Sequence, residues 1–179
     1  MPLNLLKKYP ELLELTGPLR DMNASLKRIY VRDIEDNPDF KFHGIPIHPI
    51  KAEDGQLEMD MTFSHLTTRE FEQVDDSGNK LPPRREFDIH RSVRLHWINH
   101  HVHELTPENI AVFTIIEWDQ KKREDVKHTY IYDRGQKYVI VFDRREQKHF
   151  RLLTAYYLNE PYAEKMMAKK MKKKLPEVL

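Results

Sequence analysis

The chain has 179 residues, no cysteine, and 30 basic residues against 29 acidic ones, which leaves a net charge of +1. This length suffices for one domain with a hydrophobic core, and the absence of cysteine excludes disulfides and thiolate chemistry. A net charge near zero provides no molecule-wide attraction to nucleic acid or to a membrane. No stretch approaches the roughly 20 apolar residues of a membrane span. The N-terminus lacks the signal-peptide pattern, so the sequence favours a cytoplasmic protein with no membrane partner.

The N-terminal segment predicts helices followed by a connector. A short helix is expected up to Leu15, and a second one follows the break at "TGP". The second helix is indicated by apolar residues at spacings of three and four: Leu19, Met22, Leu26 and Ile29. Prolines and glycines interrupt "NPDFKFHGIPIHPIKAEDG", which predicts an irregular connector. We therefore assign residues 1–56 to a helical segment with its connector.

A strand and a polar loop are expected next. In "LEMDMTFSH", apolar and polar residues alternate from Leu57 to Ser64, the period of two that is typical of a half-buried strand. His65 then falls at the end of the apolar side, at the rim of the core. The segment "EQVDDSGNKLPPRRE" is polar throughout and predicts an exposed loop.

A helix is predicted from Phe87 to Leu105, ended by Pro107. Its apolar face carries Leu95, Ile98, Val102 and Leu105. Its other face, which is expected to point away from the core, carries His96, His100 and His103. Three histidines on one helix rarely bind one ion without a ligand from elsewhere, so a solvated or RNA-facing side is the preferred interpretation. We predict no metal and no cofactor.

The C-terminal half predicts an antiparallel sheet. Four apolar segments, "NIAVFTIIEW", "VKHTYIYD", "KYVIVFD" and "HFRLLTAYYL", are joined by short polar links, as in a meander. The tail, residues 161–179, predicts a basic helix. The expected class is therefore α+β, with N-terminal helices packed on a C-terminal antiparallel sheet of four to five strands.

Candidate catalytic residues fit metal-free cleavage of RNA. That reaction needs a base for the 2′-hydroxyl, an acid for the leaving 5′-oxygen, and cations or hydroxyls near the phosphate. Thr154 and Tyr156 share the parity of Phe150 and Leu152 in the last strand, which places the two hydroxyls on one face. The candidates are His65, Arg91, Arg94, His96, Thr154 and Tyr156. The alternative interpretation is structural: salt-bridged arginines, an ordinary strand threonine and a core tyrosine.

Lysines and arginines near the C-terminus predict contacts with a polynucleotide. The tail from Lys165 to Lys174 is lysine-rich, and further cations occur in the hairpin links. The candidate substrate-binding residues are Lys148, Arg151, Lys169 and Lys170. A lysine-rich terminal helix is equally typical of a solvated face or of a contact with a protein partner.

Two segments, "RSVRLHWINHHVHE" and "KYVIVFDRREQKHFRLLTAYYL", resemble the nuclease superfamily of barnase, EndoU, colicin-type and RelE-like (BECR) ribonucleases, in particular its phage and mobile-element branches. The resemblance covers roughly residues 57–160. It implies a compact domain in which helices pack on a four-stranded antiparallel sheet, and RNA cleavage without metal. Carried onto this chain, it implies a histidine, two arginines and a hydroxyl pair: His65, Arg91, Arg94, Thr154 and Tyr156.

Our hypothesis from the sequence is a metal-independent, toxin-like endoribonuclease that leaves a 2′,3′-cyclic phosphate. His65 would act as general base or acid and His96 as a second proton-transfer group. Arg91 and Arg94 would clamp the phosphate, while Thr154 and Tyr156 would orient it. The expected partners are RNA, with tRNA as a candidate, and a cognate inhibitor protein. The alternative hypothesis is a noncatalytic RNA-binding or protein-interaction module of a phage or mobile element.

Overall fold

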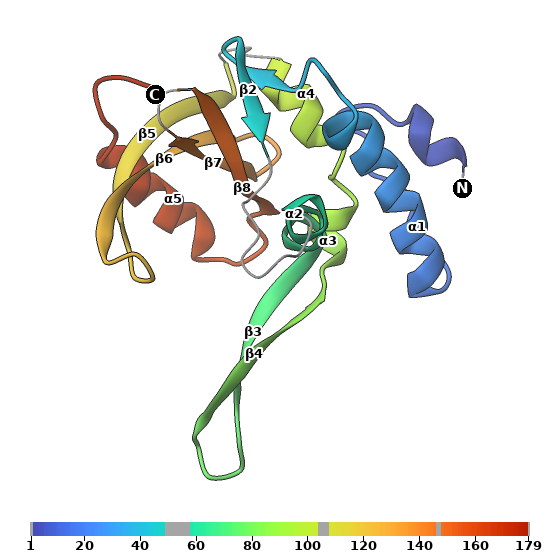
Figure 1. Cartoon of the computed structure of the whole chain (residues 1–179), viewed down its shortest axis with the longest axis horizontal. Helices are drawn as coiled ribbons and strands as arrows, with labels where there is room; N and C mark the ends of the chain where they lie inside the picture. The colour runs from blue at the N-terminus through green and yellow to red at the C-terminus, as the bar shows by residue number, and fades with distance from the viewer. Residues whose placement is uncertain (1, 49–57, 104–107, 146–147, 179) are drawn as a thin grey trace.

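The fold is α+β, as predicted, and its centre is a mixed six-stranded sheet with the order β1-β2-β8-β7-β6-β5 (Figure 1). The computed structural model describes residues 2–48, 58–103, 108–145 and 148–178. The strands are β1 (Lys41–Phe42), β2 (Ile45–His48), β5 (Ile110–Asp119), β6 (Glu124–Asp133), β7 (Tyr138–Arg145) and β8 (His149–Tyr157). Neighbouring strands are antiparallel except β2 and β8, which run parallel. The sheet is therefore larger than the predicted antiparallel one.

The two additional strands come from the segment that was predicted to be a connector. Strands β1 and β2 form a hairpin whose turn is His43 and Gly44, with φ angles of 49° and 76°. Positive φ at both turn residues matches the twist of a two-residue hairpin, and glycine adopts it without strain. Ile47 of β2 then pairs with Phe150 of β8. The rest of the connector, with the domain boundary predicted at 56/57, lies outside the described residues.

Helices cover both faces of the sheet (Figure 1). A short 3-10 helix, η1 (Pro2–Leu6), precedes α1 (Leu19–Tyr30), and η2 (Val31–Glu35) continues α1 as a π-helix. The helices α1, α2 (Glu58–Thr67), α3 (Ile89–Ser92) and α4 (Trp97–His103) lie on one face, and α5 (Ala163–Lys172) lies on the other. Among the described helices, none has the length and apolar character to cross a bilayer.

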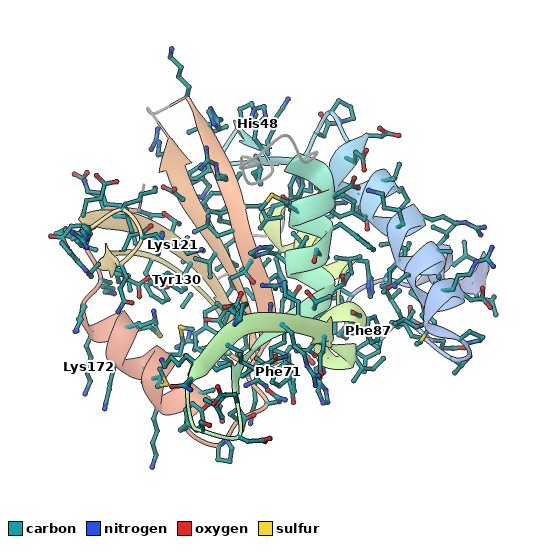
Figure 2. All side chains as sticks on the ribbon, turned by 60° about the horizontal axis from the view of Figure 1, so that its bottom comes forward. His48, Phe71, Phe87, Lys121, Tyr130 and Lys172 are labelled. Carbon is teal, nitrogen blue, oxygen red and sulfur yellow. The ribbon has the colours of Figure 1, made fainter. Side chains whose placement is uncertain are left out.

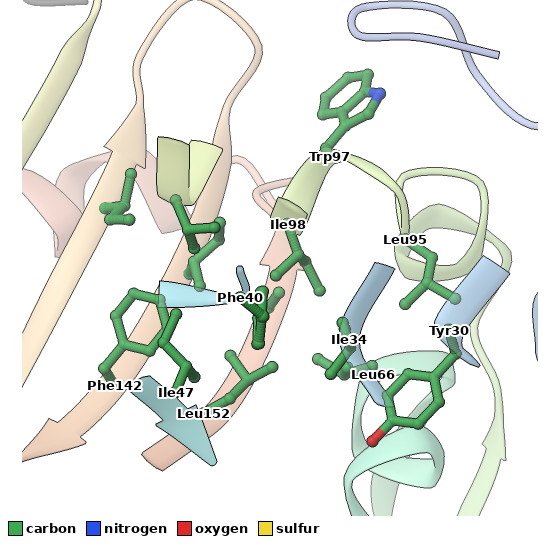
Figure 3. Close-up of a cluster of buried hydrophobic side chains, with 14 of the residues drawn as sticks. Tyr30, Ile34, Phe40, Ile47, Leu66, Leu95, Trp97, Ile98, Phe142 and Leu152 are labelled. Carbon is green, nitrogen blue, oxygen red and sulfur yellow. The ribbon is translucent and has the colours of Figure 1, made fainter. Parts of the chain in front are cut away.

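A separate hydrophobic cluster fills each side of the sheet. On the side of α1, α2 and α4, Leu66, Trp97 and Ile98 pack with Phe142 and Leu152 (Figure 3). On the α5 side, a smaller cluster contains Phe113, Ile115, Tyr130, Val139, Val141 and Met167. Burying each such side chain contributes roughly 1.5–3 kcal/mol, so both clusters hold the layers together.

The segment predicted as a strand, "LEMDMTFSH", forms helix α2 instead. Its buried residues are Thr62, Leu66 and Thr67, a spacing of four and five that fits one helical face, whereas Met61 and Phe63, on the side that strand alternation would bury, are only partly buried. Leu, Met and Glu are good helix formers, and alternation over eight residues is too short to exclude a helix. His65 consequently lies in the last turn of a helix.

The segment predicted as an exposed loop is a long hairpin of β3 (Thr68–Val74) and β4 (Lys80–Phe87), which projects from the body (Figure 1). Its turn is built around Asp75, whose carboxylate accepts from the backbone N–H groups of Ser77 and Asn79. Gly78 completes the turn with a φ of 82°. Neither face of this hairpin packs on a hydrophobic core. Its sequence therefore lacks the alternation of apolar and polar residues that marks a half-buried strand.

The helix predicted from Phe87 is interrupted between α3 and α4. Leu95, Ile98 and Val102 are buried as predicted. His96 is buried too, with 5% exposure, which contradicts its expected outward position. Residues 93–96, between the two helices, do not follow the helical period, so Leu95 and the adjacent His96 are both buried. Leu105 and the predicted end at Pro107 lie outside the described residues.

Candidate functional site

Polar side chains lie on the α5 face of the sheet, among the apolar residues of the smaller cluster. Thr154 and Tyr156 of β8 pair with Val141 and Val139, whose side chains belong to that cluster. Tyr130 is buried in the same cluster, on the side of the sheet that faces α5 (Figure 2). Together with residues of β5, β6 and α3 they form what we call the polar strip: Glu117, His128, Tyr130, Thr154, Tyr156 and Arg91.

Glu117 is the centre of one end of the polar strip. His128 Nδ1 lies 2.9 Å from Glu117 Oε2, and the Tyr130 hydroxyl donates to the same oxygen. Lys170 of α5 forms an ion pair with Glu117 Oε1 and donates to the Tyr130 hydroxyl at 3.0 Å. The carboxylate thus holds an imidazole and a phenol from β6 and an ammonium from α5.

The protonation of Glu117 follows from these partners. Burial alone raises the pKa of its carboxyl, but the hydrogen bonds from His128, Lys170 and Tyr130 outweigh burial and lower the pKa to about 2. Burial, followed by the hydrogen bond to Glu117, raises the pKa of Tyr130. Near neutral pH, Glu117 is therefore a carboxylate that accepts a hydrogen bond from the neutral phenol of Tyr130.

Arg91 occupies the other end of the polar strip and is fixed from several sides. Its NH1 donates to the carbonyls of His65 and Thr68 at 3.0 and 3.2 Å, and to Thr154 Oγ1 at 3.4 Å. Its Nε lies 3.5 Å from a carboxylate oxygen of Asp88, the residue that caps α3. A guanidinium held in this way keeps its charge and orientation before any ligand binds.

Tyr156 links the two ends electrostatically. The guanidinium carbon of Arg91 lies 5.8 Å from the centre of the Tyr156 ring. Burial raises the pKa of Tyr156 to about 12, with a further increase from Glu117 and an opposing decrease from Arg91. The hydroxyl is therefore neutral near pH 7 and can donate a hydrogen bond between a carboxylate and a cation.

A cavity of about 210 Å³ opens beside Arg91 and Tyr156. Its walls bring together the cations Arg69, Arg91 and Lys170. Arg69 lies 3.6 Å from Glu160, which also lines the cavity. Guanidinium, ammonium and phenol donors around one opening are the groups that bind phosphate oxygens.

His65 is half-buried in the last turn of α2, and its backbone carbonyl accepts from Arg91. Burial lowers the pKa of the imidazole, and the nearby cations Arg85 and Arg91 lower it further. The ring is therefore mostly neutral at pH 7 and able to accept a proton.

The structure brings some of the predicted site residues together and places others elsewhere. Arg91, Thr154, Tyr156 and Lys170 belong to the strip or its cavity, and His65 lies next to Arg91. The other predicted site residues lie outside the strip and its cavity: Arg94, His96, Lys148, Arg151 and Lys169.

Arg94 and His96 lie away from the strip. The Arg94 guanidinium stacks 3.8 Å over the Tyr157 ring, and its NH1 donates to the His90 carbonyl. His96 is buried next to Trp97, with 6.4 Å between the ring centres, and burial lowers its pKa to about 4. Both side chains are thus built into the body of the protein.

The remaining basic candidates divide between two regions. Lys148 precedes β8, and Arg151 faces Asp143 in the β7–β8 register, near the start of the strand. Thr154 and Tyr156 lie further along the same strand. Lys169 is exposed on α5, next to Lys170, which lines the cavity.

A β-bulge changes the face on which the β8 hydroxyls lie. The pairing shifts between Val141 and Phe142, so that Leu153 is an extra residue in β8. Phe150 and Leu152 face the larger cluster, but Thr154 and Tyr156 face α5. The prediction that all four share one face is therefore wrong, although the two hydroxyls do share a face.

Glu117 and His128 were not among the predicted site residues, although the sequence contains a signal for each. Glu117 has the parity of the buried residues Phe113 and Ile115, and His128 has that of Tyr130. A titratable residue on the buried side of a strand requires a partner. Matching two such positions across neighbouring strands, at a distance of 11 residues in the chain, would have identified the pair.

Comparisons with protein families, with curated proteins and with solved structures find no match to this chain. Within the described residues, no three His, Asp or Glu side chains converge in a way that could hold a metal ion. The functional argument therefore depends on the geometry of the polar strip and its cavity.

Proposed function

We propose that this protein is a metal-independent endoribonuclease, in which the 2′-hydroxyl of RNA attacks the adjacent phosphorus and the bond to the 5′-oxygen breaks. The products are a 2′,3′-cyclic phosphate and a 5′-hydroxyl. The observation that carries the proposal is the polar strip, which has a histidine–carboxylate pair at one end and, at the other, a fixed arginine that lines a cavity together with Lys170.

The two proton transfers are assigned to two histidines. His65 has a lowered pKa, so its neutral ring takes the proton of the 2′-hydroxyl. His128 Nδ1–H donates to Glu117, so in its imidazolium form the ring gives the Nε2 proton to the leaving 5′-oxygen and becomes neutral imidazole. His128 replaces His96, the group suggested by the sequence.

Charge on the phosphate in the transition state is stabilised by donors that are already in place. Arg91 supplies a guanidinium held by two backbone carbonyls, and Tyr156 supplies a neutral hydroxyl. Lys170 supplies an ammonium in the wall of the same cavity. Preorganised donors of this kind need no reorganisation when charge develops, and each contributes roughly a hundredfold or more to the rate.

The resemblance to phage and mobile-element ribonucleases extends this proposal to a toxin-like enzyme with a cognate inhibitor. The second candidate is an RNA-binding module without catalysis, favoured by exposed lysines along α5 and at its C-terminal end: Lys165, Lys169, Lys172 and Lys173. That candidate predicts binding of RNA with no cleavage, so one assay separates the two.

Purified protein incubated with RNA in excess EDTA tests the proposal. We expect fragments with 2′,3′-cyclic phosphate ends, and no cleavage at a position where the 2′-hydroxyl is replaced by hydrogen. Arg91→Gln should slow cleavage about a hundredfold or more, while Arg20→Gln, an exposed change on α1, should leave it unchanged. Intact RNA at high protein concentration, or equal rates for wild type and Arg91→Gln, would contradict the proposal.

A further inference from the structure

A second opening runs along the outer edge of the sheet, between β5 and α5. It has a volume of about 500 Å³, within the range typical of ligand sites. We call it the Trp118 groove, and its walls are Ile115, Ile116, Glu117, Trp118, Met166, Lys169, Lys170 and Lys173. It is distinct from the cavity beside Arg91, but the two share part of α5.

Large apolar side chains are exposed in this groove. Trp118 is 60% exposed, Met166 52% and Ile116 48%. The other tryptophan, Trp97, is only 1% exposed. Indole is costly to leave in water, and exposed apolar groups gathered at one opening mark a binding site.

Cations line the same groove. Lys169 of α5 and Lys173, which caps its C-terminal end, are exposed and lie four residues apart, which places them on one side of the helix. Lys121, in the turn after β5, and Lys172 lie on the same side of the molecule (Figure 2). An exposed indole flanked by lysines is the combination that binds single-stranded nucleic acid, where bases stack and phosphates are neutralised.

The groove is continuous with the proposed active site. Met166 and Lys170 line both the groove and the cavity beside Arg91. Glu117 lines the groove while it holds His128 of the polar strip. A strand bound in the groove is therefore led past Lys170 towards the catalytic groups.

We propose that the Trp118 groove binds a single-stranded segment of RNA next to the scissile phosphate, with one base stacked on Trp118 and phosphates on Lys169 and Lys173. The identity of the ligand as RNA rests on the proposed function, but the binding itself requires no cleavage. Bases in a duplex are stacked on each other, so the groove selects unpaired RNA.

Intrinsic fluorescence tests this proposal on the full chain. The probe is a short 2′-O-methyl oligouridylate, which cannot be cut by 2′-hydroxyl attack. We expect it to quench the emission of wild-type protein and to protect it from iodide, because Trp118 is exposed and Trp97 is buried. In Trp118→Phe the remaining emission should not respond, although affinity, followed by anisotropy of a labelled probe, should be largely retained because phenylalanine also stacks.

Further variants divide stacking from charge. Trp118→Ala should weaken binding about tenfold. Lys169→Gln with Lys173→Gln should reduce the slope of log affinity against log salt by about 1.4, because each phosphate neutralised on a single strand contributes about 0.7 to that slope. The matched control, Lys8→Gln with Arg20→Gln, removes two exposed charges of the N-terminal segment and should leave the slope unchanged.

Three results would overturn the groove: no response of Trp118 to the probe, equal affinity for the Trp118→Ala variant, or equal affinity for a duplex of the same length. These outcomes are separable from failure of the nuclease proposal. Quenching of Trp118 without any RNA cleavage would contradict the nuclease proposal and support the proposal that the groove binds RNA. Cleavage of RNA without any change in Trp118 fluorescence would support the nuclease proposal and contradict RNA binding in the groove.

Discussion

Two clusters of the same composition lie on the sheet, and each joins a histidine, a carboxylate and a tyrosine. The buried cluster consists of His101, Asp133 and Tyr9. The open cluster consists of His128, Glu117 and Tyr130. In both, the histidine nitrogen approaches the carboxylate, at 3.3 Å in the first and at 2.9 Å, as a hydrogen bond, in the second.

The two clusters differ in how far solvent can reach their side chains. The side chains of His101 and Asp133 are 2% and 1% exposed, and the Tyr9 hydroxyl donates to Asp133 at 2.6 Å, which ties the N-terminal segment to the sheet. His128 and Glu117 are 21% and 25% exposed, and Glu117 lines the Trp118 groove. Residue types alone therefore do not distinguish a buried structural pair from a pair that a ligand can reach, and solvent access makes the distinction.

The largest expected effect is on stability, from Asp133→Ala in the buried cluster. Removing one partner of a buried pair leaves His101 and the Tyr9 hydroxyl without an acceptor. We expect a loss of about 3–5 kcal/mol in the free energy of unfolding, measured by urea denaturation. Glu117→Ala is the matched control and should lose less than Asp133→Ala, at most about 3 kcal/mol, because water reaches its partners. Equal losses would show that the two clusters do not differ as described.

Acid titration gives the next effect. The pKa of Glu117 is about 2 in the folded protein against 4.5 in its ordinary state, so its contribution is fully present above pH 4.5 and is lost as pH falls towards 2. Wild type should lose on the order of 3 kcal/mol more than Glu117→Gln over this range, since glutamine does not titrate. Urea denaturation at several pH values measures both proteins. Parallel curves would mean that Glu117 is not held as a carboxylate.

His128→Ala should affect activity and leave the fold intact. A general acid contributes about a hundredfold or more to the rate, so RNA cleavage should fall by at least that factor. The melting temperature should change little, because the side chain is partly exposed. His101→Ala should give the opposite result: a lower melting temperature, with near-normal specific activity in the folded fraction. A His128→Ala protein with full activity would remove the acid from the mechanism.

Much of the fold could be predicted from the sequence because its strands are built on regular alternation. Strands β5 to β8 and helices α1 and α5 follow the expected segments. The errors occurred where the pattern depends on tertiary contacts. Helix α2 was assigned as a strand, and the β3–β4 hairpin has no core to impose a pattern.

The candidate site was only partly predictable, for a related reason. Arg91, Thr154 and Tyr156 could be proposed because each is a phosphate-binding type in an apolar segment. The bulge at Leu153, however, reverses the face of β8, and nothing in the local alternation shows it. Glu117 and His128 become recognisable only when the register of β5 and β6 is known, because their pairing is a contact across strands.

The smallest effect is expected from Thr154→Val, a change of nearly equal volume in the polar strip. The Thr154 hydroxyl accepts from Arg91 at 3.4 Å, whereas the carbonyls of His65 and Thr68 accept from the same nitrogen at 3.0 and 3.2 Å. Arg91 therefore keeps its position when the weakest of these bonds is removed, and cleavage should slow only a few-fold, equivalent to roughly 0.5–1 kcal/mol. Single-turnover rates of cleavage at saturating protein measure this directly. A hundredfold loss would instead show that the Thr154 hydroxyl contacts the reacting phosphate itself, which would move the centre of the site from Arg91 to β8.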